Sequence, residues 1–289
     1  IYTWRYTLSL HDALPIFHTK AALERNAGSI SDFANSVRVM RRHEIERIGL
    51  AWMSGVTDDA TSLAGMTDVY DAIIEASLRW AIRHQLDEMR FDEAPAAITV
   101  IGMGRYGGRE VNFSSDADVI IIYRPTEEAD DGQANLFARK VQEDLRAILQ
   151  GPTTFEPKIE LDMDLRPEGK NGPLVRSYAS CEEYYRSWAS TWEHQALLRA
   201  RHAAGDVALA EDFLVNIADP LRYPKTDLTE TQIAEIRKLK ARMEAERLPR
   251  GVRRERHLKL GKGGLYDVEW TIQLRSEERR VGKECTSKC

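Results

Sequence analysis

Apolar residues recur at helical spacing through the first third of the chain, between residues 21 and 93. This period predicts amphipathic helices that lead into the rest of the protein, with Thr67 and Asp68 as a start signal for one of them. The apolar positions that carry the period are Val37, Met40, Ile45, Ile48, Val69, Ile73, Ala76 and Trp80. A basic face on such helices is usually solvated, and we expect this of three arginines, Arg38, Arg41 and Arg42.

The period changes from helical to alternating at Ala96. A short apolar strand is expected at residues 98–101, and the β-branched run 117–123 is typical of a mostly buried strand. A helix should follow and end at Gly151-Pro152. Its apolar face consists of Leu136, Phe137, Val141, Leu145 and Ile148. Apolar and charged residues then alternate strictly from Ile159 to Arg166, which predicts a strand with one apolar and one charged face.

Beyond Arg166 the chain reads as helical again. Ser180 with Glu183, and Thr229 with Gln232, have the spacing of capping boxes at helix starts. A basic segment at residues 250–262 precedes a last helix start. The fold class expected from these elements is α+β: a small mixed sheet flanked by helices, with helical segments before and after it.

Composition and charge narrow the class of protein. The chain has 289 residues with 43% hydrophobic and 30% charged content, which predicts a folded protein of either one large unit or two to three small ones. No apolar run approaches the roughly 20 residues of a membrane helix, so we expect no membrane partner. The net charge of -5 argues against a nucleic-acid partner. Three cysteines are too few for a disulfide framework, which favours a reducing, cytoplasmic location.

The two ends differ in character from the rest. Residues 7–16 and 276–283 resemble translated sequencing-adapter sequence. We therefore expect residues 1–17 and 276–289 to be artefactual and to carry no chemistry.

Three glycines after the first predicted strand, Gly102, Gly104 and Gly107, match the G-x-G-x-x-G fingerprint of dinucleotide-binding proteins. That fold needs a parallel crossover of a dozen or more residues, usually a helix. Only about ten residues without helical period separate Gly107 from Asp118. A Gly-Lys-Ser or Gly-Lys-Thr is also missing after these glycines, so a P-loop does not fit either.

The acidic residues give a better interpretation. Asp116 and Asp118 stand two apart at the start of the second strand, so both carboxylates project from one face, about 7 Å apart. Asp162 lies on the charged face of the later strand. If the two strands are neighbours, three carboxylates converge, and they repel unless cations lie between them. The sequence therefore predicts a metal site made of Asp116, Asp118 and Asp162.

Mg²⁺ is the metal that suits such ligands, because it usually takes one or two carboxylates together with substrate phosphates. Two Mg²⁺ ions and a nucleoside triphosphate are expected, with Asp162 taking the proton from the attacking hydroxyl. The phosphates are expected at a glycine turn, two serines and an arginine: Gly104, Arg105, Gly107, Gly108, Ser114 and Ser115. The alternative is that Asp116 and Asp118 cap a turn while Asp162 and Asp164 form a solvated face paired with Arg166.

Several motifs together resemble a known family. Glycines followed by Ser-Asp-x-Asp and a distal Asp are similar to the polymerase-beta-like nucleotidyltransferase superfamily. Five blocks between about residues 30 and 275 resemble the glutamine-synthetase adenylyltransferase family: GMGRYGGRE, SSDADVIIIY, DMDLRPEGKNGPLV, TWEHQALLRAR and LKLGKGGLYDVEW. The TWEHQALLRAR block is most similar to the C-terminal half of these enzymes, which the resemblance associates with adenylylation.

The resemblance implies a helical lead-in at residues 18–95, a nucleotidyltransferase catalytic domain at 96–179 and a helical domain at 180–275. It implies Mg²⁺-dependent transfer of AMP from ATP to a tyrosine hydroxyl of glutamine synthetase, within bacterial nitrogen regulation and with the PII signalling protein as a partner. It gives Asp116, Asp118 and Asp162 the role of metal ligands. Two alternatives stay open: phosphorolytic removal of AMP by the same fold, and a non-catalytic module that binds nucleotide or a partner.

Overall fold

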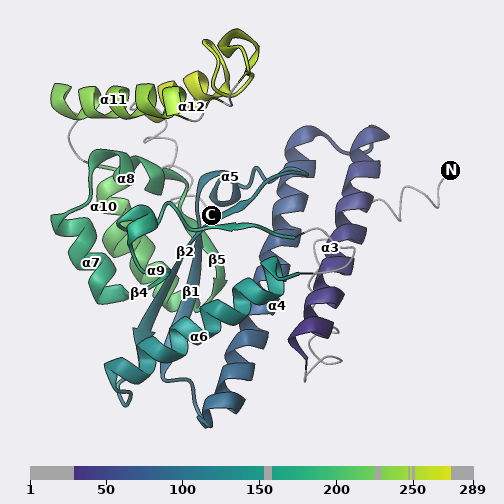
Figure 1. Cartoon of the computed structure of the whole chain (residues 1–289), viewed down its shortest axis with the longest axis vertical. Helices are drawn as coiled ribbons and strands as arrows, with labels where there is room; N and C mark the ends of the chain where they lie inside the picture. Colours follow the sequence, from purple (N-terminus) through teal and green to yellow (C-terminus); the bar gives the residue numbers. More distant parts are fainter. Residues whose placement is uncertain (1–28, 153–157, 225–228, 247, 249–250, 275–289) are drawn as a thin grey trace. The chain divides into compact units, whose positions relative to one another are not determined.

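The computed structural model describes residues 29–152, 158–224, 229–246, 248 and 251–274 (Figure 1). The expected artefactual ends, 1–17 and 276–289, lie outside these residues. The described residues form two compact units: the first contains those up to 185 together with 199–214, and the second contains 186–198 and those from 215 onward.

Two long antiparallel helices open the first unit: α3 (Ile30–Met53) and α4 (Asp59–Met89). Within the described residues these two helices lie where helical periodicity was predicted, and most of the apolar positions that carry it are buried. The predicted start at Thr67 is wrong, because α4 begins eight residues earlier under an N-cap from Asp58, whose side chain accepts from Thr61 N. Thr67 is buried in mid-helix. In the part of the chain that the structure describes, no helix is both long and apolar enough to cross a membrane.

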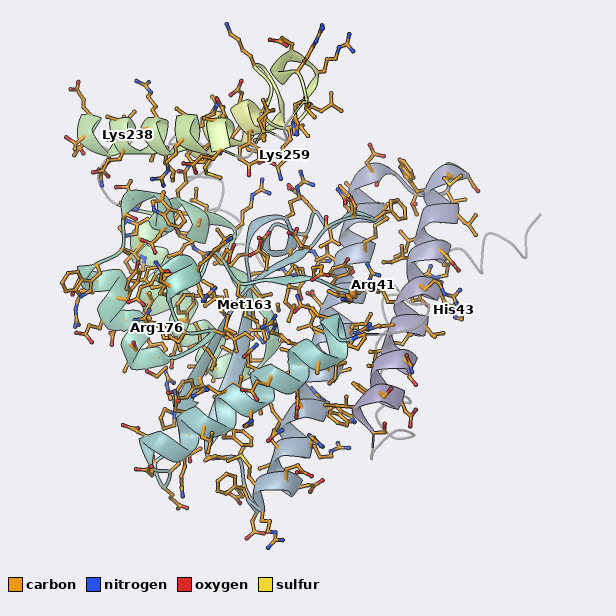
Figure 2. The ribbon with its side chains drawn as sticks, viewed as in Figure 1. Arg41, His43, Met163, Arg176, Lys238 and Lys259 are labelled. Carbon is orange, nitrogen blue, oxygen red and sulfur yellow. The ribbon has the colours of Figure 1, made fainter. Side chains whose placement is uncertain are left out.

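The expectation of a solvated basic face on α3 is wrong for two of its three arginines. Arg38 is 1% exposed and Arg41 is 6% exposed. The guanidinium of Arg38 donates to Ile148 O and to Gly151 O (2.9 Å), at the end of α6 (Asp131–Gln150). Arg41 lies between α3 and α4, where it donates to the hydroxyl of Tyr70 at 2.9 Å (Figure 2). Both arginines therefore hold helices together, because buried charge is tolerated only with such partners.

Among the described residues the sheet has five strands, with the order β3-β2-β1-β5 and with β4 pairing β2 as well. The strands are β1 (Ala96–Gly102), β2 (Ala117–Pro125), β3 (Leu161–Asp162), β4 (Val175–Ser177) and β5 (Arg201–Gly205). β1 pairs antiparallel with β2 and with β5, whereas β3 and β4 both pair parallel with β2. The expected α+β fold with a small mixed sheet flanked by helices is confirmed.

Helix α6 lies across one face of this sheet (Figure 1) and is the helix predicted before Gly151-Pro152. Its apolar stripe is buried as expected, apart from Leu136, which is 46% exposed. Its N-cap is Asp130, whose carboxylate accepts from two backbone N–H groups of the first turn. α6 also packs against α3 and α4, so it connects the sheet to the helical pair.

The later strands depart from the sequence prediction in two ways. The strand expected from Ile159 to Arg166 is reduced to the two residues of β3. Its alternation of buried and less buried side chains nevertheless persists from Ile159 to Asp164. Second, the chain beyond Arg166 is not only helical, since β4 and β5 both join the sheet.

Short helices fill the connections of the first unit: α5 (Gly104–Gly107), η1 (Gly169–Asn171), α7 (Tyr178–Ser187) and α9 (Val207–Asp212). Three helical segments, α7 among them, have residues in both units; the other two are η2 (Leu197–Arg199) and η3 (Phe213–Ala218). The second unit holds α8 (Thr191–Ala196), α10 (Asp219–Arg222), α11 (Glu230–Glu246), η4 (Arg254–Arg256) and α12 (Leu265–Leu274).

One of the two predicted capping boxes is confirmed. Thr229 and Gln232 exchange hydrogen bonds at the start of α11. The box that begins α8 is made by Ser190 and Glu193 rather than by the predicted Ser180 and Glu183. Ser180 instead lies inside α7.

Candidate active site

A single helical turn, α5, joins β1 to β2 at one end of the sheet. The two strands are antiparallel, so the parallel crossover of a dinucleotide-binding fold is absent between them, as the sequence predicted. The N–H of Met103, just before α5, donates to Asp118 O at 2.8 Å. This bond ties the start of the glycine turn to the strand that carries Asp118.

At two positions in this turn other groups approach so closely that a side chain larger than that of glycine does not fit. Gly104 has φ +52°, and a Cβ built on it would lie 2.2 Å from Oδ2 of Asp118. A Cβ on Gly107 would lie 2.1 Å from Arg199 O and 2.6 Å from Gly102 O. The carboxylate of Asp118 therefore rests against the glycine turn, in a position that only glycine at 104 permits.

The strands that carry the predicted metal ligands are neighbours. β2 and β3 run parallel, with Asp118 as the register partner of Asp162. Register partners on adjacent strands project to the same face, about 4.8 Å apart at Cα. Asp116, exposed just before β2, lines a cavity of 470 Å³ together with Asp162 and Asp164. The structure thus brings the three aspartates of the prediction to one end of the sheet.

Asp164 is distinguished from Asp162 by its partners. Its carboxylate lies 3.3 Å from the ammonium of Lys170 and 3.9 Å from the guanidinium of Arg166. Its N–H donates to Oδ1 of Asp162 at 2.7 Å, which turns the chain away from the sheet after two strand residues. Asp164 is therefore an ion-paired residue of this turn.

Arg166 does not lie on the predicted charged face, because it is buried with 7% exposed. Its guanidinium donates to the carbonyls of Met163 (2.8 Å), Gly172 (3.0 Å) and Lys170 (3.1 Å). These carbonyls belong to the loop between β3 and β4, so Arg166 shapes one wall of the cavity.

The two serines of the predicted phosphate site belong to a closed turn organised by Asn112. Oδ1 of Asn112 accepts from Ser114 N (3.0 Å) and from both serine hydroxyls. The hydroxyl of Ser115 in turn accepts from Asn112 N at 3.0 Å, and Ser115 O accepts from the Tyr70 hydroxyl at 3.0 Å. Sequence reasoning missed Asn112, although it stands two residues before the Ser-Ser pair.

Arg201, at the start of β5, braces the glycine turn from behind. It binds Asp71 of α4 through both terminal nitrogens, at 2.8 and 3.0 Å, and it donates to Tyr106 O at 3.1 Å. Burial lowers the pKa of Arg201, but the bonds to Asp71 outweigh this and the pKa is raised. Burial first, and then the charge of Asp71, raises the pKa of the Tyr106 phenol well above its ordinary value. Both groups therefore keep their protons at any physiological pH.

Beside Arg201, Arg199 pairs with Glu110 at 2.7 Å. The carbonyl of Arg199 faces Gly107 as described above. For Arg199 the sequence left two roles open, a bracing Glu–Arg pair and substrate contact. Arg201 was given no role, although it belongs to the TWEHQALLRAR block.

Two of the three aspartates predicted to bind metal are adjacent in register. Within the described ranges, no group of three or more His, Cys, Asp or Glu side chains is arranged to hold a metal ion by itself. Mg²⁺ commonly takes one or two carboxylates and completes its shell with substrate phosphate oxygens. Asp118 and Asp162, adjacent in register and beside the glycine turn, provide oxygen donors of this kind.

Comparison with known proteins identifies the family. The family model described as glutamate-ammonia ligase adenylyltransferase matches residues 12–216. This chain belongs to the glutamate-ammonia ligase adenylyltransferase family.

Individual relatives carry a more particular name. A bifunctional glutamine synthetase adenylyltransferase/adenylyl-removing enzyme of Bifidobacterium longum (strain DJO10A) is 78% identical over 256 residues, which cover 89% of this chain and 24% of that relative. The protein of the same name from Mycobacterium tuberculosis (strain CDC 1551 / Oshkosh) is 46% identical over 237 residues, covering 82% of this chain and 23% of the relative. The chain thus spans about a quarter of the length of the curated relatives it matches.

Proposed function

We propose that this chain is an adenylylating catalytic region, which transfers AMP from ATP to a tyrosine hydroxyl of glutamine synthetase with Mg²⁺ as cofactor. The observation that carries the proposal is the register pairing of Asp118 with Asp162 beside the glycine turn. The names of the relatives, which include glutamine synthetase and adenylyltransferase, supply the substrate and the group transferred. The PII signalling protein as regulator and a cytoplasmic location are part of the same proposal.

Asp118 and Asp162 would hold Mg²⁺, with Asp116 at the edge of the same cavity. When bound, the metal neutralises charge on the triphosphate and on the leaving pyrophosphate. The glycine turn with Gly104, Gly107 and Gly108, together with the Asn112 turn that presents Ser114 and Ser115, positions the phosphates. Arg105 adds a permanent positive charge there.

Asp162 takes the proton from the tyrosine hydroxyl while the tyrosine oxygen attacks the α-phosphorus. The backbone N–H of Asp164 donates to Oδ1 of Asp162. This bond fixes the carboxylate and leaves its second oxygen for the reaction. The N–H of Met103 donates to Asp118 O. This bond links the turn proposed to bind phosphate directly to the strand proposed to bind metal.

The test is transfer of label from α-labelled ATP to glutamine synthetase in the presence of Mg²⁺. Asp118→Asn and Asp162→Asn should each lower the rate on the order of 100-fold or more, as loss of a preorganised charge stabiliser does. Asp164→Asn is the matched control, because Asp164 is paired with Lys170. The proposal is wrong if the native chain transfers label and Asp118→Asn does so equally well.

Removal of AMP by phosphorolysis is the second candidate, favoured by the words "adenylyl-removing enzyme" in the relatives' names. It predicts release of ADP from adenylylated glutamine synthetase and phosphate, without net transfer from ATP. A non-catalytic binding module predicts neither reaction and no effect of Asp118→Asn on nucleotide binding.

A further inference from the structure

The geometry of in-line displacement determines the side from which the acceptor enters, given the proposed function. The attacking oxygen and the leaving pyrophosphate must lie on opposite sides of the α-phosphorus. The phosphate-binding turn lies beside Asp118, and Asp162 is on the next strand outward. The acceptor must therefore approach from the side of β3, away from β1.

On that side the acid-lined cavity opens into a groove of about 1020 Å³. Four residues line both the cavity and the groove, which makes them continuous: Arg146, Arg166, Lys170 and Leu174. One wall is α6 and the other is the loop from Arg166 to Val175 that the Arg166 guanidinium holds in shape. Met163, labelled in Figure 2, lines the cavity end of this path.

The α6 wall is a single stripe of the helix. Its members recur at three- and four-residue spacing: Asn135, Arg139, Gln142, Glu143, Arg146, Ala147 and Gln150. The stripe runs from residue 135 to residue 150, and sixteen helical residues extend over about 22 Å. An extended polypeptide covers about 3.3 Å per residue, so the groove accommodates six or seven residues in a row.

The groove is basic. Arg139 and Arg146 are exposed on α6, two helical turns apart. On the opposite wall the Lys170 side chain is 82% exposed, and its ammonium is paired with Asp164 at 3.3 Å. The one acid of the stripe, Glu143, is paired with Lys140 at 2.8 Å.

The floor of the groove offers a further donor. Gln142 is 4% exposed, and its amide nitrogen has no hydrogen-bond partner among the described residues. Charged and neutral donors along one path select a ligand rich in acceptors, and above all one with carboxylates.

We propose that this groove, between α6 and the loop 166–175, binds an extended acidic segment of the protein acceptor and leads its tyrosine to Asp162. Acidic residues of the segment pair with Arg139 and Arg146. The tyrosine enters the cavity where these walls meet the aspartates. The groove thereby sets which tyrosine is modified, because only a tyrosine with acidic neighbours is held there.

Binding tests the groove without requiring catalysis. Two eleven-residue peptides, each with one central tyrosine, are compared by fluorescence anisotropy at low salt: one flanked by glutamates and one flanked by lysines. We expect the glutamate peptide to bind the native chain at least tenfold more tightly. The double variant Arg139→Glu/Arg146→Glu should abolish or reverse this preference. Arg83→Glu is the control, because Arg83 is an exposed arginine on α4 outside the lining of the groove, and it should change the preference less than twofold.

The outcomes separate the groove from the proposed function. The proposal that the groove binds an acidic segment is wrong if the two peptides bind equally well, or if the preference survives the double variant. The proposal is also wrong if the double variant weakens ATP binding as much as peptide binding, because the groove then binds the nucleotide. An intact charge preference without label transfer to glutamine synthetase leaves the groove in place and rejects the proposed function. Arg139→Gln/Arg146→Gln, which removes charge without reversing it, should give an intermediate loss and guards against misfolding of the reversed variant.

Discussion

Replacing Gly104 by alanine tests whether Asp118 must keep its observed position against the glycine turn. The added Cβ would lie 2.2 Å from Oδ2 and 2.8 Å from the carboxyl carbon of Asp118, whereas ordinary contact begins at 3.4 Å. The carboxylate must therefore retreat by about 1 Å, and a displacement of this size costs roughly 100-fold in rate. In activation free energy that is about 2.7 kcal/mol. Alanine at φ +52° adds a stability cost of roughly 1 to 2 kcal/mol.

Gly55→Ala separates these two effects. Gly55 has φ +66° and no atom within 4 Å of a built Cβ, so its substitution carries the backbone cost alone. We expect both variants to lose similar stability in urea denaturation. Only Gly104→Ala should lose AMP transfer, measured with α-labelled ATP and glutamine synthetase well below the unfolding midpoint. Transfer by Gly104→Ala within threefold of the native rate, or equal loss in both variants, would refute the placement of Asp118 in the reaction.

Two further predictions concern buried groups of the first unit. Arg38→Met leaves the carbonyls of Ile148 and Gly151 without their donor. It should lower the free energy of unfolding, measured in urea, by about 3 kcal/mol. Arg42→Met, at a half-exposed position, should change this free energy by less than about 0.5 kcal/mol. Burial raises the pKa of the Cys181 thiol to about 12, so the unfolded chain loses this proton first as pH rises. The free energy of unfolding should then fall between pH 9 and 11 more steeply than in Cys181→Ala, by about 1.4 kcal/mol per pH unit, and equal slopes would contradict the assignment.

Long periodic elements could be predicted from the sequence because the pattern itself determines them. The strand at 117–123 and the helix ending at Gly151 carry enough apolar residues in register to specify which face is buried. The rejection of a dinucleotide fold likewise needed only the chain length between Gly107 and Asp118.

β5 was missed because its residues, Arg201 to Gly205, include two alanines that favour a helix when read locally. Only pairing with β1, which lies about 100 residues earlier in sequence, makes this segment a strand. The buried state of Arg38 has a similar origin, since its carbonyl partner at Ile148 is 110 residues away. Local periodicity contains no information about such partners.

For the candidate site, the sequence predicted three aspartates but not their surroundings. The register of Asp118 with Asp162 depended on whether two strands were neighbours, which only the fold could settle. The bond from the Asp164 N–H to Asp162 shortens β3. The strict alternation of apolar and charged residues in the sequence gives no sign of this local effect. The bracing of the glycine turn by Arg201 and Asp71 joins residues 130 positions apart.

The position of β5 has a consequence for how the protein is made. β1, the glycine turn and β2 leave the ribosome on the order of 100 residues before β5 does, which at ordinary rates of synthesis is roughly 5 to 20 seconds. During that interval one edge of β1 has no partner strand, and Gly107 lacks the Arg199 carbonyl that later packs against it. The nascent chain therefore passes through a stage with an open sheet edge, when it is open to mispairing with other chains. Arrival of residues 199–205 ends that vulnerability and completes the phosphate-binding turn in a single event.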